Sequence, residues 1–458
     1  MSMAAERMSR VDTAWLRMDN DVNLMTIVGV WLLTPAITLD ALRERIEYRL
    51  LKYDRFRQKA VADAMGAHWV NDEHFDITRH VVPAHLQVAP GESERQALQR
   101  LCGELAMTPL DASRPLWQFQ FIESYEGGSA LIARIHHCIG DGIALISVMM
   151  SITDGGADPP KRRKRAMAEM YGGGMAKTME LLSNPKQPLM GSVMGGMDMA
   201  RSGYKLIGDV AALALMPDDS PTALKGKPAG RKVVAWSEPM SLDDVKTVGK
   251  GLNCSVNDVL LGCVAGAFGA YLRGRGDEPA GKEIRAMVPV NLRPPEQAWQ
   301  LGNRFGLAPL VLPIGIVNPV ERTYAVHRRM NEMKGSYQPL LAFAVLAMSG
   351  LFIKPVQDLV LGMFSKKATA VMTNVPGPAV PLKFCGSTLR QTMFWVPSSG
   401  DIGVGVSILS YGGGVQFALI TDAALCPEPQ KIIDLFEPEF EKLLHLTLML
   451  PWPGQSID

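Results

Sequence analysis

The chain has 458 residues, 47% of them hydrophobic, so it can bury a substantial core and is long enough for two domains. Its formal net charge is +1, from 47 basic and 46 acidic residues, and this balance gives no indication of a nucleic-acid partner. The six cysteines form neither a CxxC pair nor a regular disulfide framework, which is typical of free thiols in a reducing compartment.

The first ten residues contain Glu6 and Arg7 and no continuous apolar stretch, so we expect a cytoplasmic protein without a signal peptide. The longest apolar run, residues 339–353, is interrupted by a Ser-Gly pair and is shorter than the ~20 apolar residues that a spanning helix needs. The apolar segment 339–364 therefore predicts core packing, the lining of a substrate tunnel, or a helix that lies on a membrane surface.

The first third of the chain predicts strands and helices in alternation, which indicates an α/β fold. The predicted strands are residues 27–33, 116–124 and 129–136, and the predicted helices are 39–53, 92–107 and 143–152. The last two strands are joined through Glu126-Gly127-Gly128 and predict a hairpin. The polar segment 137–142 consequently lies where a strand leads into a helix, a position that commonly holds catalytic groups.

Residues 154–230 differ in composition, with glycine and proline pairs and many methionines, and predict a linker that contains helices. The basic run 161–165 within it is interpreted as a solvated linker, with a membrane-surface or phosphate-binding patch as the alternative. We therefore divide the chain into an N-terminal domain of residues 1–153, the linker of residues 154–230 and a C-terminal domain of residues 231–458.

The α/β pattern returns in the C-terminal part. The predicted strands are residues 233–236, 284–289, 306–312, 368–373, 403–410 and 415–421, and the predicted helices are 242–249, 256–273, those between 319 and 364, and 429–444. The sequence shows no short internal repeat, although two halves of different sequence can share one topology.

The most distinctive motif is the heptapeptide HHCIGDG, from His136 to Gly142, at the end of an apolar strand. Adjacent residues on a strand point to opposite faces, so one histidine can face a channel while the other packs inward. His137 is the candidate general base, because a neutral imidazole can take a proton from an attacking alcohol and return it to the leaving group. Cys138 is expected to be a small buried hydrophobe rather than a nucleophile.

Asp141 can act as a base itself or can fix the turn through an ion pair, and the flanking Gly140 and Gly142 favour the ion pair. Arg293 is the partner that we predict for it. Paired histidines also occur in metal sites, but the sequence offers no HExxH motif and no cluster of cysteines as further ligands. We therefore expect catalysis without a metal.

HHxxxDG is the signature of the coenzyme A-dependent acyltransferase superfamily, which includes chloramphenicol acetyltransferase, carnitine acyltransferases and the condensation domains of peptide synthetases. Further motifs follow in order along almost the whole chain: PLW at 115–117, NDVLL at 257–261, PVNLR at 289–293, GNRF at 302–305, TNVPGP at 373–378, and SILSY at 407–411 with Asp422. Together they resemble the bacterial wax ester synthase/diacylglycerol acyltransferase family. Two departures are a Met-Thr pair at Met25 in place of Met-His, and Asn291 in place of a serine.

The resemblance implies two chloramphenicol-acetyltransferase-like domains, each a mixed sheet flanked by helices, with a tunnel between them. It implies transfer of a long-chain acyl group from acyl-CoA, a co-substrate rather than a cofactor, to a fatty alcohol or a diacylglycerol, giving wax esters or triacylglycerol. It also suggests peripheral association with the inner membrane or with lipid inclusions, because such alcohols are delivered from lipid surfaces.

The resemblance also assigns the site residues. The catalytic group is His137 with His136, Asp141 and Asn257. Asn257 is placed by its motif as the donor to the oxyanion, or alternatively caps a helix that begins at Asp258. Three residues are expected to support the site: Gly142, Arg293 and Asp258. Four are expected to shape the tunnel or the crossover between domains: Pro115, Trp117, Asn374 and Gly377.

Two other functions share these motifs. An amide-forming condensation enzyme normally belongs to a multidomain synthetase with carrier domains, for which this chain has no room. A non-catalytic lipid-binding relative is expected to lack the base or the turn acid, and both His137 and Asp141 are present. An ester-forming acyltransferase is therefore favoured.

Overall fold

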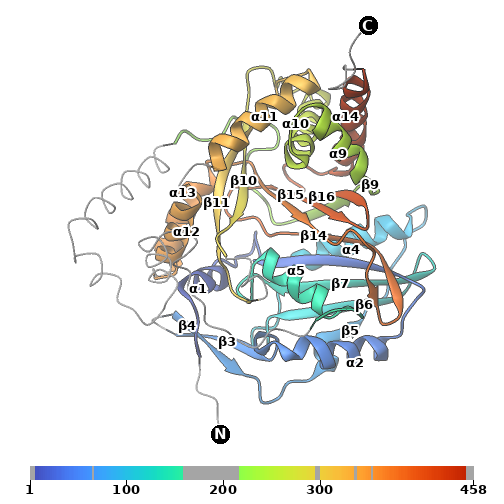
Figure 1. Cartoon of the computed structure of the whole chain (residues 1–458). Helices are drawn as coiled ribbons and strands as arrows, with labels where there is room; N and C mark the ends of the chain where they lie inside the picture. The colour runs from blue at the N-terminus through green and yellow to red at the C-terminus, as the bar shows by residue number, and fades with distance from the viewer. Residues whose placement is uncertain are drawn as a thin grey trace.

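The computed structural model describes residues 6–63, 66–157, 216–293, 300–334, 338–351 and 354–449. The basic run 161–165 and most of the predicted linker lie outside the described residues. Figure 1 shows two layered α/β halves, one above the other, each built on a central sheet with helices against it. The predicted α/β class with two such halves is confirmed.

The first sheet has the strand order β13-β14-β2-β7-β6-β5. Its members are β2 (Thr26–Thr34), β5 (Val81–Pro83), β6 (Trp117–Tyr125), β7 (Gly128–His136), β13 (Lys383–Phe384) and β14 (Ser387–Trp395). Every residue of β7 is buried, and its side chains alternate between two core clusters, so both faces of this central strand are covered. The covering helices are α2 (Leu39–Arg49), α4 (Glu94–Ala106) and α5 (Gly142–Ser151).

The second sheet runs β11-β10-β12-β15-β16-β8, with the short β9 pairing with β16. Its members are β8 (Lys232–Trp236), β9 (Met240–Ser241), β10 (Ile284–Asn291), β11 (Phe305–Leu312), β12 (Ala370–Pro376), β15 (Val404–Tyr411) and β16 (Gly414–Asp422). Four helices pack around the core of this half: α9 (Leu242–Gly251), α10 (Val256–Gly274), α11 (Pro319–Lys334) and α14 (Gln430–Leu448). A third core cluster joins the halves, where Trp236 of β8 lies 5.8 Å from Trp395 of β14, between ring centroids.

Strand β14 crosses from the C-terminal part of the chain into the first sheet, where it pairs antiparallel with β2. The sequence did not predict this strand, because a register shift between Leu389 and Gln391 interrupts the alternation of buried and exposed positions. The division into residues 1–153, 154–230 and 231–458 stays a prediction, and β14 is the element that links its first and last parts.

Other differences from the sequence expectation lie at the N-terminus. The helix predicted for residues 39–53 ends at Arg49 and continues as two short 3-10 turns. A small sheet of β1 (Glu6–Arg7), β4 (Gly66–Asn71) and β3 (Gln58–Asp63) and the helix α1 (Arg10–Arg17) were not predicted. Helix α1 is capped by Ser9, whose side chain accepts a hydrogen bond from the backbone of Asp12, and this places α1 against the site.

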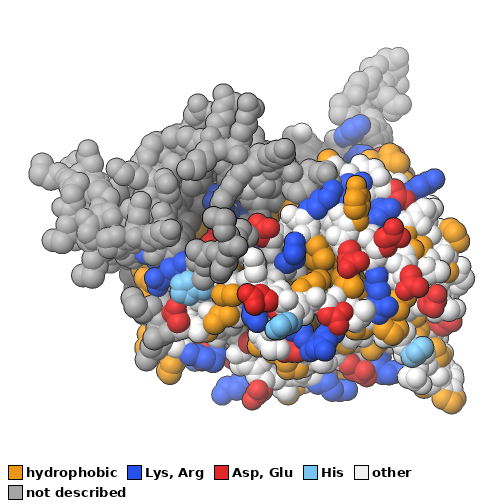
Figure 2. All heavy atoms as spheres, turned by 90° about the horizontal axis from the view of Figure 1, so that it is seen from below, with side chains coloured by type: hydrophobic (Ala, Val, Ile, Leu, Met, Phe, Trp, Pro, Cys, Tyr) orange, Lys and Arg blue, Asp and Glu red, His pale blue; other side chains and the backbone are white. Residues whose placement is uncertain are grey.

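The apolar segment forms α12 (Gln338–Ser349) and α13 (Lys354–Ser365). Among the described residues no single helix is both long and apolar enough to cross a membrane; α9 and α10 meet the length and composition test only as a pair bent by 99°. On the face shown in Figure 2, acidic and basic side chains are interspersed with apolar ones.

Candidate active site

The HHCIGDG segment forms a tight turn between β7 and α5. Strand β7 ends at His136, and His137 is the first residue of the turn, where its backbone N–H donates to the carbonyl of Met25 at 2.7 Å. The strand predicted for residues 129–136 ends at the same residue as β7, and His137 lies one residue beyond it, in the predicted junction. The two side chains nevertheless enter different surroundings, as the alternation predicted.

His136 supports the turn and does not face the cavity described below. Its Nδ1 accepts a hydrogen bond from the backbone N–H of Cys138 at 3.1 Å, and its Nε2 lies 3.3 Å from the carboxylate of Asp19. His136 lines neither of the two apolar cavities described below, and its assignment to the catalytic group stays a prediction.

Hydrogen bonding fixes the tautomer of His137. Its Nδ1 lies 2.9 Å from the side-chain oxygen of Asn303, and an amide oxygen only accepts, so Nδ1 carries the hydrogen. The amide nitrogen of Asn303 in turn donates to Asp12 at 2.8 Å and to the backbone oxygen of His137 at 2.7 Å, which sets the orientation of the amide. The unprotonated nitrogen of the His137 imidazole is therefore Nε2, and its lone pair is available to accept a proton.

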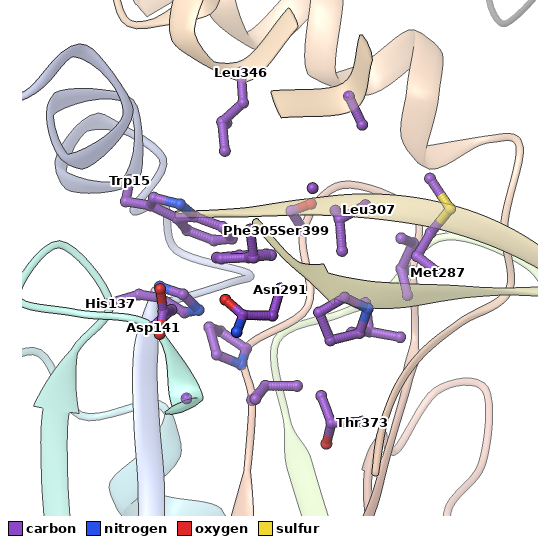
Figure 3. Close-up of a pocket in the computed structure, with 18 of the residues that line it drawn as sticks. Trp15, His137, Asp141, Met287, Asn291, Phe305, Leu307, Leu346, Thr373 and Ser399 are labelled. Carbon is purple, nitrogen blue, oxygen red and sulfur yellow. The ribbon is translucent and has the colours of Figure 1, made fainter. Parts of the chain in front are cut away.

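The ring of His137 is held between aromatic side chains. Trp15 of α1 stacks on it with ring centroids 4.0 Å apart and planes within 10°, and Phe305 of β11 lies 5.6 Å away. Figure 3 shows the three rings together at one end of the cavity. Burial lowers the pKa of His137 to about 4, so the imidazole is neutral at neutral pH.

The predicted ion pair between Asp141 and Arg293 is present, and it is bidentate. The two guanidinium nitrogens lie 3.1 and 2.8 Å from the two carboxylate oxygens, and both side chains are buried. Asp141 also caps α5 by accepting from the backbone of Ala144, and it accepts from the backbone of Arg304. Asp141 thus connects the turn to the C-terminal half, and both of its carboxylate oxygens accept hydrogen bonds in this connection.

A largely apolar cavity, the histidine cavity, lies between the two halves. It is bounded by α1, the HHCIGDG turn, β10, β11, α12, α13, β12 and the segment after β14. His137, Asp141 and Asn291 face it from one side, and Met287, Leu307 and Leu346 line its apolar walls (Figure 3). A charged base would be poorly solvated here, whereas an acyl chain would be well accommodated.

A second apolar cavity lies between the first sheet and α5. It shares Gly142 and Phe394 with the histidine cavity, so the two meet beside the HHCIGDG turn. A Cβ built on Gly142 meets no atom within 4 Å, which means that a larger side chain would extend into this junction. Gly142 therefore keeps the junction open, a role beyond the support of the turn that was predicted.

The four predicted tunnel residues divide into two groups. Asn374 lines the histidine cavity and Gly377 lines the second cavity. Pro115 and Trp117 line neither of these cavities, because Trp117 packs into the core of the first half and its indole N–H donates to the carbonyl of Phe56. They border a separate polar pocket instead, and their predicted part in shaping the tunnel or the crossover between domains stays a prediction.

Asn257 does not cap α10. Helix α10 begins at Val256, and Ser255 is its cap in a reciprocal pair with Asp258, so the capping alternative for Asn257 is wrong. The side-chain oxygen of Asn257 accepts from Asn374 at 2.8 Å, which places Asn257 behind a cavity residue rather than in the cavity wall. Its role as oxyanion donor stays a prediction.

Asp258 supports α10 and contacts His327 of α11 at 2.7 Å. Together with Cys254 these two residues form a group close enough to hold a metal ion. Both ring nitrogens of His327 are engaged, however, since Nδ1 contacts Asp258 and Nε2 lies 3.0 Å from the amide nitrogen of Asn331. The group therefore acts as a hydrogen-bonded link between α10 and α11.

Three residues of the site were missed by the sequence reasoning: Asp12, Trp15 and Asn303. Asn303 belongs to the GNRF segment, which was noted as a resemblance but not given a role. Asp12 and Trp15 lie in α1, close to the N-terminus, and nothing in their local pattern signals a site. Only the fold brings Trp15 against His137, and Asp12 against the Asn303 side chain that contacts His137.

The fold and the turn together define an acyltransferase-type architecture, in which two α/β halves enclose a cavity with a buried histidine. Family models agree with this class: the wax ester synthase/diacylglycerol acyltransferase catalytic domain matches residues 8–260, and the C-terminal domain of the same family matches residues 301–444. The chain belongs to the wax ester synthase/diacylglycerol acyltransferase family, and it is an O-acyltransferase.

Relatives and solved structures agree with this membership. A probable diacylglycerol O-acyltransferase of Mycobacterium tuberculosis is 26% identical over 90% of this chain and 89% of its own length. The O-acyltransferase WSD of Acinetobacter baylyi is 26% identical over 82% of this chain and 83% of its own. The wax ester synthase/diacylglycerol acyltransferase structure from Marinobacter aquaeolei superposes with a TM-score of 0.67 at 20% identity, covering 97% of this chain and all of that one.

The fold is shared more widely. The first condensation domain of a calcium-dependent antibiotic synthetase superposes with a TM-score of 0.61 at 14% identity, covering 100% of this chain and 99% of that one. This likeness concerns the fold alone.

Proposed function

We propose that the protein transfers a long-chain acyl group from acyl-CoA to the hydroxyl of a lipid alcohol, with His137 as the general base. The observation that supports this most directly is the tautomer of His137, whose Nε2 lone pair belongs to a ring that lines an apolar cavity. An apolar cavity suits acyl chains and gives a neutral base the environment in which it acts on an alcohol.

The proposed reaction has two steps. Nε2 of His137 takes the proton of the acceptor hydroxyl as the alcohol oxygen bonds to the thioester carbon, which gives a tetrahedral oxyanion. The oxyanion then collapses, the carbon–sulfur bond breaks, and the imidazolium returns the proton to the departing thiolate of coenzyme A. The contact with Asn303, which Asp12 orients, holds the ring for both transfers. Acyl-CoA is a co-substrate, and no metal or organic cofactor enters these steps.

The oxyanion needs a hydrogen-bond donor, and Trp15 offers one. Its ring lines the histidine cavity and stacks on His137, and none of the described residues accepts a hydrogen bond from its Nε1. Asn257 remains the other candidate, although it lies behind Asn374. An unpaired buried N–H beside the base is suited to a charge that forms only during the reaction.

Trp15→Phe is therefore expected to lower kcat by roughly tenfold or more, because it removes the N–H while it retains an aromatic ring against His137. The KM for acyl-CoA should change little. The same steady-state assays are carried out on Asn257→Ala, which removes the other candidate donor. If Asn257→Ala loses kcat and Trp15→Phe does not, the donor is Asn257.

The pH dependence follows from the burial of His137. Because the base acts only when neutral and burial lowers its pKa to about 4, kcat/KM should stay level from about pH 8 to about pH 6 and should fall only as pH approaches that value. The measurement is a pH profile of kcat/KM with a neutral alcohol acceptor. If kcat/KM fell to half of its maximum near pH 6.5, which is about the usual pKa of histidine, the lowered pKa of His137 would be contradicted.

One screen tests both the class of acceptor and the use of an acyl-CoA as the acyl donor. Palmitoyl-CoA is supplied with fatty alcohols, diacylglycerols and amines, and release of the free thiol is followed for each. Thiol release with alcohols or diacylglycerols and not with amines supports ester synthesis. Release with amines alone would assign the amide-forming alternative, and no release with any acceptor would refute the proposed function.

The acceptor is proposed to reach the cavity from a lipid surface at α13. The inward residues Leu361 and Phe364 of this helix line the histidine cavity, while Val356, Leu359 and Met363 are exposed on its outside. One apolar helix thus separates the cavity from solvent, and its exposed side suits the headgroup boundary of a membrane or a lipid inclusion. We propose accordingly a cytoplasmic protein that associates peripherally with such surfaces.

Leu359→Glu should weaken binding to phosphatidylcholine vesicles by roughly tenfold, because a charged side chain replaces one that is buried in the interface. Cosedimentation with vesicles measures the effect. Val88→Glu, at another exposed apolar position, serves as the matched control and should bind as the parent does. Equal binding of all three proteins would rule out α13 as the contact.

A further inference from the structure

A polar pocket, here called the arginine pocket, lies on the first half away from both apolar cavities, and it shares no residue with them. It is bounded by the segment after α4, the start of β6 and the end of β7. Pro115 and Trp117, the motif residues that the transfer reaction does not use, form part of its wall. Three arginines line it: Arg79, Arg114 and Arg134.

Arg134 is buried without a counter-charge. It is 2% exposed, its Nη1 donates to Gln118 at 3.2 Å and its Nη2 donates to the carbonyl of Thr108. Its Nε has no partner, and no carboxylate of the described chain pairs with it. Burial lowers the pKa of Arg134 to about 10, so the guanidinium stays charged at neutral pH. Fully buried arginines are normally paired, so the charge of Arg134 favours the binding of an anion in this pocket.

The other charged groups leave the pocket positive. Asp111 pairs with Arg114 at 3.3 Å, and Asp76 pairs with Arg79 at 3.4 Å, both as partly exposed pairs three residues apart. Such pairs are weak and are readily exchanged for a stronger anionic ligand. Arg134 supplies the charge that these carboxylates do not neutralise.

His80 indicates which anion fits. It is 2% exposed and stacks on Trp117, and its Nδ1 lies 2.8 Å from the carbonyl of Trp117, so Nδ1 carries the hydrogen. His80 is among the residues that line the pocket, and its Nε2 is buried without any partner in the described chain and can only accept while the ring is neutral. Burial lowers the pKa of His80, which keeps the ring neutral, against the opposing effect of Asp72 and Asp76.

We propose that the arginine pocket binds a phosphate group. Monohydrogen phosphate, or a phosphate monoester that keeps one proton, presents anionic oxygens to Arg134 and Arg114 and one O–H to Nε2 of His80. A carboxylate or a sulfate has no such hydroxyl at neutral pH and would leave His80 unpaired. The site takes either free phosphate or the headgroup of a phosphomonoester lipid, and it does not depend on the proposed acyl transfer.

The test is a titration of the full chain with inorganic phosphate, followed by ³¹P NMR and by calorimetry. Phosphate should bind, and sulfate should bind roughly tenfold more weakly, because one hydrogen bond to a buried group is lost. Arg114→Gln, at a partly exposed position where the fold should survive, should lower phosphate affinity by roughly tenfold. Arg390→Gln, which removes a surface arginine elsewhere, is the charge-matched control and should bind phosphate as the parent does.

Two results would overturn the proposal: a parent protein that binds no phosphate, and an Arg114→Gln variant with the parent's affinity. Equal affinity for sulfate and phosphate would overturn the assignment to phosphate. Vesicles of phosphatidylcholine with added phosphatidic acid separate the two sources. Displacement of bound phosphate by these vesicles, and not by phosphatidylcholine alone, supports the lipid headgroup, and retention of phosphate supports the free ion.

Discussion

His137→Ala should lower kcat by about 10²- to 10⁴-fold while the protein remains folded, because it removes the group proposed to take the acceptor proton. The ring contributes one hydrogen bond to Asn303 and packing against Trp15, and the adjacent cavity allows water to reach the vacated space. The measurement is thiol release from acyl-CoA at saturating alcohol, with circular dichroism and thermal unfolding on the same preparation.

His74→Ala is the matched control, because it removes an exposed histidine of the same half and should leave the rate unchanged. Turnover by His137→Ala at the parent's rate would end the assignment of the base.

A second comparison concerns Asn303→Ala, which releases Nδ1 and should lower kcat without a matching rise in KM.

The second large effect is expected at the Asp141–Arg293 pair. Removing either partner leaves a buried charge unpaired, which costs about 3–5 kcal/mol of folding free energy. Asp141→Ala should therefore damage stability and activity together, since the same carboxylate caps α5 and holds the turn that carries His137. Chemical denaturation of Asp141→Ala, Arg293→Ala and the double variant gives the coupling energy.

The double variant should be more stable than the sum of the two single losses predicts, because it leaves neither charge alone. Strict additivity would contradict a functional pair. Arg322→Ala is the control, since Arg322 forms a buried ion pair with Glu439 in the other half. It should cost comparable stability but leave kcat of the folded protein unchanged.

The parts of the site that lie within one short segment were predictable from the sequence. The HHCIGDG turn and its position between a strand and a helix follow from the local pattern. The Asp141–Arg293 pair joins residues 152 positions apart, and it was predicted because a buried carboxylate needs a charged partner. Asp12, Trp15 and Asn303 were not predictable in this way, because the contacts of Trp15 and Asn303 with His137, and of Asp12 with Asn303, depend on the docking of α1 and on the loop before β11.

Asn257 shows how a motif position can mislead. Its place in the NDVLL segment suggested a cavity donor or a helix cap, but the serine two residues earlier takes the cap, and the reciprocal Ser255–Asp258 arrangement was readable from their three-residue spacing. Most of the strands and helices were predicted within a few residues, since their hydrophobic periods are regular. Strand β14 was missed because its bulge hides the period and its partner is more than 350 positions away.

That crossing strand restricts how the enzyme can admit its substrates. The hydrogen bonds between β14 and β2 join the C-terminal half to the N-terminal half. The two halves therefore cannot open by a hinge movement without breaking a run of main-chain hydrogen bonds. Substrates must therefore enter, and products must leave, without a separation of the two halves along these hydrogen bonds. A truncated chain ending before Ser387 would in addition leave the backbone N–H and C=O groups along this edge of β2 unpaired, and the open edge would promote aggregation.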